Sequence, residues 1–362
     1  MKKYKVGVIG GTGMVGQRFV TLMADHPWFQ LTVIAASPRS AGKRYEDAVA
    51  GRWAMDTPIP ENARDIVLMS AQDDVEKIAA MVDFVFSAVD MKKEEIKALE
   101  EAYAKFECPV VSNNSAHRWT PDVPMVIPEV NADHLKVIDA QRKRLGTRRG
   151  FIAVKSNCSI QSYVPALSPL REFGIEKILV CTYQAISGAG KTFATWPEMV
   201  DNLIPYIGGE EEKSEQEPLK VWGRVEDDVI VNADAPAITA QCLRVPVSNG
   251  HTAAAFVTFK NKPTMEQMKE AWRTYRGRPQ ELDLPTAPKQ FLNYFEEPDR
   301  PQVKLDRDLE GGMAVSIGRL RPDTQYDYKF VSLSHNTLRG AAGGAVLLAE
   351  LLCAEGYIEP RD

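Results

Sequence analysis

The chain has 362 residues, of which 44% are hydrophobic, and a formal net charge of −5. These numbers indicate an ordinary globular protein with enough length for two domains. The acidic balance gives no electrostatic reason to expect nucleic acid or an anionic membrane as a partner. No stretch approaches the roughly 20 uninterrupted apolar residues of a membrane-spanning helix, and the first residues enter a strand too early for a signal peptide, so we expect a cytoplasmic protein.

The first predicted elements are a strand, a glycine-rich turn and a helix, in "YKVGVIGGTGMVGQRFVTLMADHP". Gly11, Gly13 and Gly16 match G-x-G-x-x-G, and Gly10 allows the alternative frame G-x-x-G-x-x-G. In such a turn the backbone can approach a pyrophosphate, and the helix N-terminus faces the phosphates. A second strand at 31–37 favours a dinucleotide site over a purely structural glycine turn. The residues that we expect at the cofactor here are Gly11, Thr12, Gly13, Met14 and Val15.

The end of the second strand indicates which dinucleotide binds. NAD-binding proteins usually carry an acidic residue about 20 residues after the glycines. This chain reads "AASPRSAGKRY" instead, where Ser37, Arg39 and Ser40 suit a 2′-phosphate, with Arg39 supplying the charge. We therefore predict NADP(H) rather than NAD; the alternative is that Arg39 is a solvated loop residue.

Further strands and helices alternate along the first half. A buried strand in 83–90 ends at Ser87, a small residue that we also expect at the cofactor, and a helix at 92–106 and a strand at 108–114 follow. This alternation predicts an α/β fold with a parallel, doubly wound sheet of the Rossmann type.

A cysteine stands out in "KSNCSIQSYVPALSPL" (155–170), after the apolar run 151–154 and before a predicted helix. A helix N-terminus lowers the pKa of a thiol, and the thiolate is the reactive form, so Cys158 is a candidate nucleophile. The chain has only five cysteines, widely spaced and without a Cys-x-x-Cys pair, which predicts neither disulfides nor a metal site.

The second half has a different pattern. Strands predicted at 177–187, 252–260 and 312–320 are separated by long polar connections, which indicates an α+β domain with a mixed or antiparallel sheet. Small residues dominate a predicted helix in 335–357, which we expect to return to the first domain.

We therefore predict two domains. Residues 1–156 form a Rossmann-type NADP-binding domain, which is completed by the C-terminal helix in 337–362. Residues 157–336 form a catalytic and dimerisation domain with the mixed sheet.

A base for the thiol is available in "CLRVPVSNGHTAAAF", where Arg244 and His251 lie on either side of a predicted turn. A positioned imidazole can take the proton from Cys158 and later act as a general acid. His335 in "SLSHN" is the rival, and for either histidine the alternative is a structural role.

Taken in order, "GGTGMVGQRF", "SNCSIQ", "QAISGAGK", "EQEPLK", "RVPVSNGH" and "SHNTLRGAAGG" resemble the aspartate-β-semialdehyde dehydrogenases, and the archaeal and fungal branch more than the common Gram-negative one. The resemblance spans nearly the full length. It implies NADPH-dependent reduction of L-aspartyl 4-phosphate to L-aspartate 4-semialdehyde and phosphate, through a cysteine thioacyl intermediate, in lysine, threonine and methionine biosynthesis. It also implies a homo-oligomer, either a dimer or a tetramer.

The resemblance assigns roles to single residues. For the chemistry it implies Cys158 as nucleophile, His251 as acid/base, Asn157 as a donor to the oxyanion and Gln184 as a contact of the acyl group. For the substrate it implies Arg244 at the α-carboxylate, Glu217 at the α-amino group, and Lys220 and Arg118 at the phosphate. For the cofactor it implies Gly188 and Asn336, the latter beside the nicotinamide.

Alternatives remain open at this point. Malonyl-CoA reductase shares the scaffold but binds no α-amino group, so the "EQEPLK" motif argues against it. N-acetyl-glutamyl-phosphate reductase fits the order of the motifs less well. A non-catalytic NADP-binding sensor would not need both Cys158 and His251. The loop at 191–199 reads "KTFATWPEM" where this branch often has Tyr-Pro-Gly, so no contacts are carried over to it.

Overall fold

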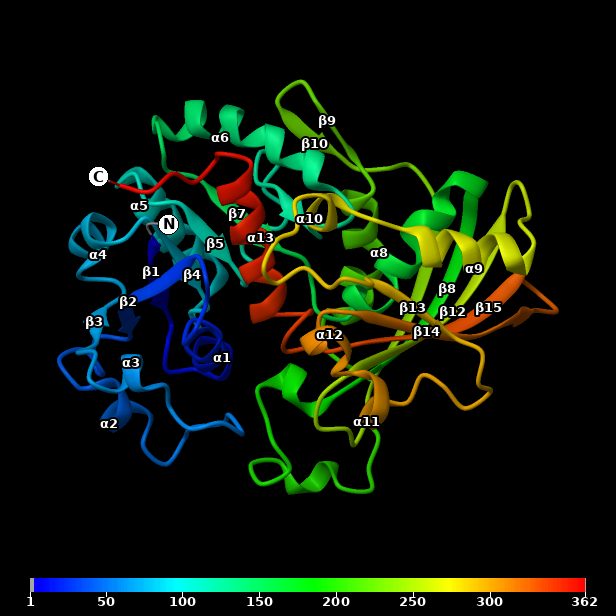
Figure 1. Ribbon diagram of the computed structural model, residues 1–362, viewed down its shortest axis with the longest axis horizontal. Helices are drawn as coiled ribbons and strands as arrows, with labels where there is room; N and C mark the ends of the chain where they lie inside the picture. Colours follow the sequence, from blue (N-terminus) through cyan, green and yellow to red (C-terminus); the bar gives the residue numbers. More distant parts are fainter. Residues whose placement is uncertain (1–2, 362) are drawn as a thin grey trace.

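Seven parallel strands form the first main sheet of the structure, a computed structural model that describes residues 3–361 (Figure 1). The strand order is β3-β2-β1-β4-β5-β7-β6, and every neighbouring pair is parallel. The order reverses between β1 and β4, which is the point where doubly wound sheets bind ligands. The prediction of a Rossmann-type sheet is confirmed. The strands are β1 (Tyr4–Ile9), β2 (Phe29–Ala36), β3 (Met69–Ser70), β4 (Phe84–Ser87), β5 (Val110–Ser112), β6 (Met125–Val126) and β7 (Ile152–Lys155).

Helices pack on both faces of this sheet. Phe84 and Phe86 of β4 share a core with residues of α1 and α13, whereas Val85 shares a core with residues of α4 and α5. This division follows from the alternation of side chains along a strand. The C-terminal helix α13 is buried all round and contacts α1, β5 and β7. The helices are α1 (Met14–Leu22), α2 (Tyr45–Val49), α3 (Glu61–Arg64), α4 (Val75–Met81), α5 (Lys93–Lys105), the 3₁₀ helix η1 (Ala132–Val137), α6 (Ile138–Leu145) and α13 (Ala342–Ala354).

The second main sheet is mixed, as predicted, with the order β11-β8-β12-β15-β14-β13. The outer pairs β11–β8 and β13–β14 are parallel, and the inner pairs are antiparallel. Residues along β12 alternate between buried and half-buried, so one face of the sheet carries the core and the other is partly exposed. The strands are β8 (Ile175–Gln184), β11 (Ala237–Arg244), β12 (His251–Phe259), β13 (Leu292–Phe295), β14 (Val315–Pro322) and β15 (Tyr328–Ser334), and β9 (Arg224–Glu226) and β10 (Val229–Val231) form a separate hairpin.

The helices of this second part are mostly short. The longest are α8 (Glu210–Val221) and α9 (Met265–Thr274). The others are η2 (Ile160–Ser162), α7 (Val164–Leu167), η3 (Ser168–Phe173), η4 (Ile186–Ala189), η5 (Pro197–Met199), α10 (Arg278–Glu281), α11 (Val303–Asp306) and α12 (Leu309–Gly312). No helix within residues 3–361 has the length and apolar character needed to cross a membrane.

The helix predicted directly after Cys158 is broken into three short turns, η2, α7 and η3. Tyr163 has a φ of −129°, outside the helical range, and Pro165 and Pro169 occupy the first turns of α7 and η3. Because proline lacks an N–H group, it is tolerated in a first turn but not in the interior of a helix. Cys158 therefore does not lie at the start of a long regular helix.

A buried ion pair within the Rossmann-type part of the chain is tied to the second part through one backbone carbonyl. Both nitrogens of the Arg339 fork donate to the Glu129 carboxylate, at 2.8 and 2.6 Å, and both side chains are fully buried. Arg339 also donates to the backbone carbonyl of Met313, just before β14. The pair thus links the end of β6, the start of β14 and the segment before α13.

Replacing Glu129→Gln should lower the free energy of unfolding by about 3–5 kcal/mol, because it leaves a guanidinium buried without its counter-charge. Urea unfolding at pH 7 measures this change. The matched control is Glu296→Gln, which breaks the exposed 2.7 Å pair with Lys269 and should cost less than about 1 kcal/mol. Equal, small losses in both variants would contradict the prediction.

Candidate active site

Cys158 lies in the loop after β7, where the two sheets meet. Its Sγ atom is 3.5 Å from Nε2 of His251, the first residue of β12. The other ring nitrogen, Nδ1, accepts a hydrogen bond of 3.0 Å from the backbone N–H of Ala185. Because a neutral imidazole has one donor and one acceptor, this contact places the proton on Nε2, which faces the sulfur. The predicted thiol–imidazole pair is therefore brought together.

The electrostatic surroundings favour neutral forms of both groups. Burial and the nearby Glu210 raise the pKa of the Cys158 thiol, against the opposing effects of Lys155, Arg118 and Arg244. Burial and Arg244 lower the pKa of His251 to about 3. The sequence-based expectation of a lowered thiol pKa is therefore wrong for this state, because the broken helix offers no long dipole and the site is buried.

His335, the other histidine that the sequence offers as a base, contacts the turn before α13. Nδ1 of His335 accepts from the backbone N–H groups of Thr337 and Leu338, at 3.3 Å each, and its Nε2 faces Asp308 at 3.6 Å. These contacts give His335 a role in shaping the turn before α13.

Two strand ends bring polar groups beside the thiol. Gln184 ends β8 and Arg244 ends β11, and the two are paired in the sheet register. Arg244 is buried, and its Nη1 donates to the carbonyl of Ala185 at 2.7 Å. A Cβ atom on Gly188 would lie 2.8 Å from that Nη1 and 3.1 Å from Cε1 of His251. Gly188 therefore lies at the site, and only glycine leaves room for both side chains.

Glu217 and Lys220 are placed differently from the prediction. The Glu217 carboxylate accepts from Nη1 of Arg118 at 2.9 Å and from the backbone N–H of Asn157 at 2.6 Å. Lys220 donates to three backbone carbonyls, at 2.6, 3.1 and 3.2 Å, and is 2% exposed. Those carbonyls belong to Arg118, Thr120 and Val123. Lys220 thus has all three donors in use on the loop 118–123, and Glu217 is paired with an arginine, so both side chains are engaged within the protein.

Glu210, together with its partner Lys213, lies beside Asn157 and Gln184, although the sequence did not single out either residue as a candidate. Glu210 accepts from the side-chain amides of Asn157 at 3.1 Å and Gln184 at 3.3 Å, and forms a 2.7 Å ion pair with Lys213. The signal was present, because Glu-x-x-Lys occurs twice in "EEEKSEQEPLK". The two copies are seven residues apart, which is two helical turns, so both lie on one face of α8.

The side chain of Asn157 is also committed within the protein. Its amide nitrogen donates to Glu210, and its oxygen accepts from the backbone N–H of Ser159 at 2.7 Å. The amide therefore points to α8, which does not fit the predicted role of a free donor to an oxyanion.

A cavity of about 320 Å³ opens beside this site. Its lining includes three cationic side chains, Lys93, Arg118 and Lys213, against two carboxylates, Glu212 and Glu217, together with Ser115 and Trp119. A cavity with several cations and a hydroxyl suits an anionic group such as phosphate.

The glycine turn borders a second cavity, of about 220 Å³, lined by Gly10, Thr12, Gly13 and Ser37 among others. Gly10 has a φ of +84°, and a Cβ on Gly16 would lie 2.1 Å from the Gly10 carbonyl oxygen. The backbone thus folds tightly here and leaves room above it, as dinucleotide binding requires. The turn is also held at Gly11, because the carbonyl oxygen of Gly11 accepts a hydrogen bond of 2.9 Å from the hydroxyl of Tyr45.

Three further cofactor candidates lie near this cavity or beneath it. Arg39 is exposed and Ser40 is half-buried in the turn after β2, where the backbone N–H of Ser40 donates to the carbonyl of Ser37 at 2.9 Å. Ser87, in contrast, is fully buried, and its hydroxyl accepts from the side chain of Asn114 at 3.0 Å. The side chain of Ser87 is thus bonded within the protein and does not line this cavity, and its contact with the cofactor stays a prediction.

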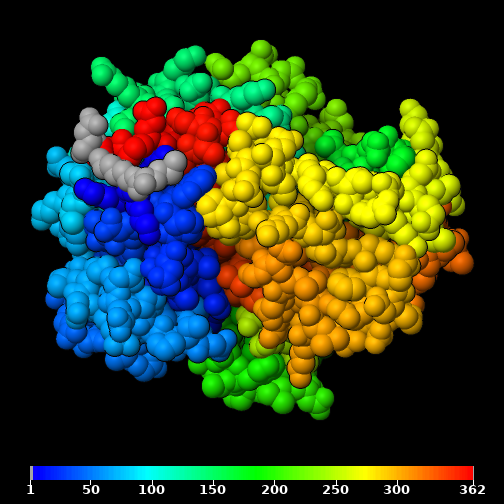
Figure 2. Space-filling view, in the orientation of Figure 1, coloured from blue at the N-terminus to red at the C-terminus, as the bar shows by residue number. Residues whose placement is uncertain are grey.

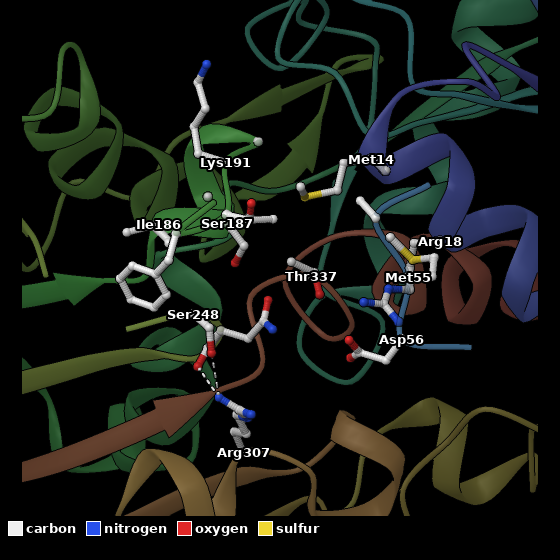
Figure 3. Close-up of a pocket in the computed structure, with 17 residues that line it drawn as sticks. Met14, Arg18, Met55, Asp56, Ile186, Ser187, Lys191, Ser248, Arg307 and Thr337 are labelled. Atoms are coloured by element: carbon white, nitrogen blue, oxygen red, sulfur yellow. Dashed lines mark hydrogen bonds between the residues drawn. The ribbon is translucent and has the colours of Figure 1, made fainter. Parts of the chain in front are cut away.

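A third cavity, of about 400 Å³, lies between the two parts of the molecule (Figure 3). Met14 and Val15 of α1 line one side, and Ser187 and Gly188 line the other. Figure 2 shows the first third of the chain in blue facing the yellow and orange part of the second half. Asn336 borders this region, since its amide donates to the Ser187 hydroxyl at 2.9 Å and accepts from the backbone N–H of Gly250.

Fold and site together define a class, the dinucleotide-dependent dehydrogenases that work through a partly buried cysteine. Residues 5–138 match the family model for the NAD binding domain of semialdehyde dehydrogenase, and residues 167–339 match the model for its dimerisation domain. Residues 3–361 contain no cluster of three or more His, Cys, Asp or Glu side chains that could hold a metal ion.

Known proteins of similar sequence and structure identify the family within this class. The chain is 43% identical to the aspartate-semialdehyde dehydrogenase of Archaeoglobus fulgidus, over 98% of this chain and 100% of that protein. It is 42% identical to the enzyme of Aspergillus fumigatus, over 98% and 99%. A crystal structure of the Candida albicans enzyme with NADP superposes with a TM-score of 0.88 at 39% identity, over 99% and 100% of the two chains. The chain belongs to the aspartate-semialdehyde dehydrogenase family.

The low pKa of His251 predicts a specific dependence of stability on pH. The folded state keeps this histidine neutral down to about pH 3, whereas an unfolded histidine binds a proton below about pH 6.5. Between these values the unfolded state binds more protons, so stability falls as the pH falls. Going from pH 7 to pH 5 should cost the wild type about 2 kcal/mol through His251 alone.

His251→Asn should remove this contribution, so its free energy of unfolding should fall by about 2 kcal/mol less than that of the wild type between pH 7 and pH 5. Urea unfolding of both proteins at pH 7, 6 and 5 gives the two slopes. Parallel slopes would mean that His251 titrates normally in the folded protein.

Proposed function

We propose that this chain is an NADPH-dependent aspartate-semialdehyde dehydrogenase, which converts L-aspartyl 4-phosphate to L-aspartate 4-semialdehyde and inorganic phosphate. The observation that carries the proposal is the 3.5 Å contact between Cys158 and His251, flanked by one carboxylate and one guanidinium, Glu210 and Arg244, in a chain of this family. A carboxylate and a guanidinium fit the amino and carboxyl groups of an amino acid. A malonyl-CoA reductase would not use the carboxylate, and a sensor would not use the thiol.

Cys158 is the nucleophile in this proposal. Its thiolate attacks the acyl carbon, so that a C–S bond forms and the C–O bond to phosphate breaks. NADPH, when bound, supplies the hydride that reduces the thioester carbonyl. The C–S bond then breaks, and the aldehyde leaves with the thiol restored.

His251 acts first as a hydrogen-bond donor. Because its proton is on Nε2, it donates to the sulfur and favours the thiolate, and it can give this proton to the oxygen or sulfur when the tetrahedral adduct collapses. A base role at Nε2 in the first step requires the other tautomer, which gives up the hydrogen bond from Ala185. The departing phosphate is itself a base that can take the thiol proton.

We assign the substrate groups to four side chains. Arg244 binds the α-carboxylate and Glu210 the α-amino group, while Arg118 and Lys213 bind the phosphate in the cavity that both of them line. Glu217 orients Arg118 through their 2.9 Å ion pair. Gln184 holds Glu210 and contacts the acyl group.

The cofactor lies along the glycine turn. We assign the pyrophosphate to the backbone of Gly11, Thr12 and Gly13, and the 2′-phosphate to Ser37, Arg39 and Ser40. The nicotinamide half extends past Met14 and Val15 toward Gly188 and Asn336. The cavities at the glycine turn and between the two parts of the molecule support this path.

The wider organisation follows the same proposal. The dimerisation-domain match indicates a homo-oligomer, and we propose a dimer or tetramer that forms through residues 157–336, with residues 1–156 and 337–362 as the NADP-binding domain. We also propose that the protein works in the cytoplasm, in the synthesis of lysine, threonine and methionine.

The reverse reaction tests the function. Purified protein with NADP, phosphate and L-aspartate 4-semialdehyde should produce NADPH, which is followed by its absorbance, and omission of phosphate should abolish the signal. Cys158→Ser should show no turnover but bind NADPH as the wild type does. Signal only with malonate semialdehyde and coenzyme A would contradict the proposal, as would substantial turnover by Cys158→Ser.

The revised assignment on α8 has its own test. Lys213→Ala should raise the KM for phosphate at least about tenfold, because a charge-assisted contact is worth about 1.5–3 kcal/mol. Glu210→Gln should raise the KM for the semialdehyde in the same way, since it loses the charge that faces the α-amino group. The matched control is Lys269→Ala on helix α9, which should leave both constants unchanged. Unchanged constants in both α8 variants would remove Glu210 and Lys213 from the site.

A further inference from the structure

Lys155, the last residue of β7, is buried beside the nucleophile, and neither the substrate nor the cofactor assignments use it. It is 1% exposed. Lysine is almost never fully buried without partners, because removing an ammonium group from water is costly. Its position therefore needs an explanation.

The partners of Lys155 join two segments that carry the chemistry. Its Nζ atom donates to the backbone carbonyls of Ser156 and Gly340. Ser156 belongs to the loop of Cys158, and a Cβ atom on Gly340 would lie 2.9 Å from the Cβ of Cys158. The ammonium group thus fastens the nucleophile loop to the segment 336–340.

Five charged or titratable groups surround this lysine. Burial lowers the pKa of Lys155 to about 7, and Arg118 adds to the effect, while Cys158, Glu217 and Glu210 raise it. Conversely, Lys155 is the first of the cationic groups that lower the pKa of the Cys158 thiol, ahead of Arg118 and Arg244. It also lowers the pKa of His251. The thiolate and the ammonium therefore stabilise one another.

We propose that Lys155 is a positioning residue for catalysis, which fixes the Cys158 thiol against the segment 336–340 and supports its thiolate form by charge. The inference rests on the proposed role of Cys158 as the nucleophile. It concerns a residue that touches neither substrate nor cofactor and acts through the sulfur and the loop that holds it.

The rate at which iodoacetamide alkylates Cys158, measured from pH 5 to pH 10 by mass spectrometry of the Cys158 peptide, reports the thiolate without any substrate. Lys155→Met removes both the charge and the two hydrogen bonds, and Lys155→Gln keeps an amide donor without the charge. Both variants should be alkylated about tenfold more slowly at pH 7, with the profile shifted to higher pH by about one unit. Their kcat in the reverse assay should fall at least about tenfold, while the KM for NADP stays within about twofold.

Lys220→Met is the matched control, because Lys220 is also buried and also bound to backbone carbonyls, but to those of residues 118–123. It should lower the free energy of unfolding and leave the alkylation rate at each pH within about twofold of the wild type.

A profile shifted only in the Lys155 variants supports the proposal. An unshifted profile in a folded Lys155 variant overturns it, as does an equal shift in Lys220→Met. Failure of both Lys155 variants to fold, while Lys220→Met folds, also overturns it, because Lys155 would then be a residue of the folding core. Absence of turnover in the wild type would refute the proposed function and leave the alkylation result interpretable.

Discussion

The buried ion pair between Arg118 and Glu217 is the contact on which the geometry of the site depends. Glu217 is on α8, and its carboxylate also accepts from the backbone N–H of Asn157, directly before the nucleophile. Arg118 in turn donates through Nε to the carbonyl of Lys155. One carboxylate and one guanidinium therefore hold the loop between β7 and Cys158 from both ends. Breaking such a pair would leave a charge buried without its partner and would release the loop.

Burial also decides the charge state of the reacting groups. Burial pushes the resting thiol and imidazole toward their neutral forms, and it also lowers the pKa of Lys155 to about 7. A thiolate that forms here lies near Lys155, Arg118 and Arg244. It loses contact with water because the site is buried, and it is stabilised instead by the positive charges of these side chains. The site is thus organised for a negative charge that is absent at rest, which suits a nucleophile that is needed only when the anionic substrate arrives.

Much of the fold follows from local patterns in the sequence. The glycine turn and the alternation of buried strands with helices predict the parallel sheet, because few other arrangements cover both faces of such strands. The pairing of Cys158 with His251 was also predicted, although their 93-residue separation required the family motifs to connect them. The full burial of the Ser87 side chain and the raised pKa of the Cys158 thiol were not predicted. Both depend on the surroundings in three dimensions: which way the last side chain of a strand points, and how deeply a loop is buried.

The reassignment that we propose on α8 has a more general physical cause. Glu210 and Glu217 precede a lysine by the same three residues and lie on one face of one helix, so their local sequence does not distinguish them. What distinguishes them is the height along the helix axis, since two turns correspond to about 11 Å. In the turn with Glu217 and Lys220, both side chains bond to Arg118 and its loop. In the turn with Glu210, the carboxylate accepts from the side chains of Gln184 and Asn157. A spacing motif therefore specifies the kind of residue and the face that it occupies, and only packing specifies which repeat reaches the substrate.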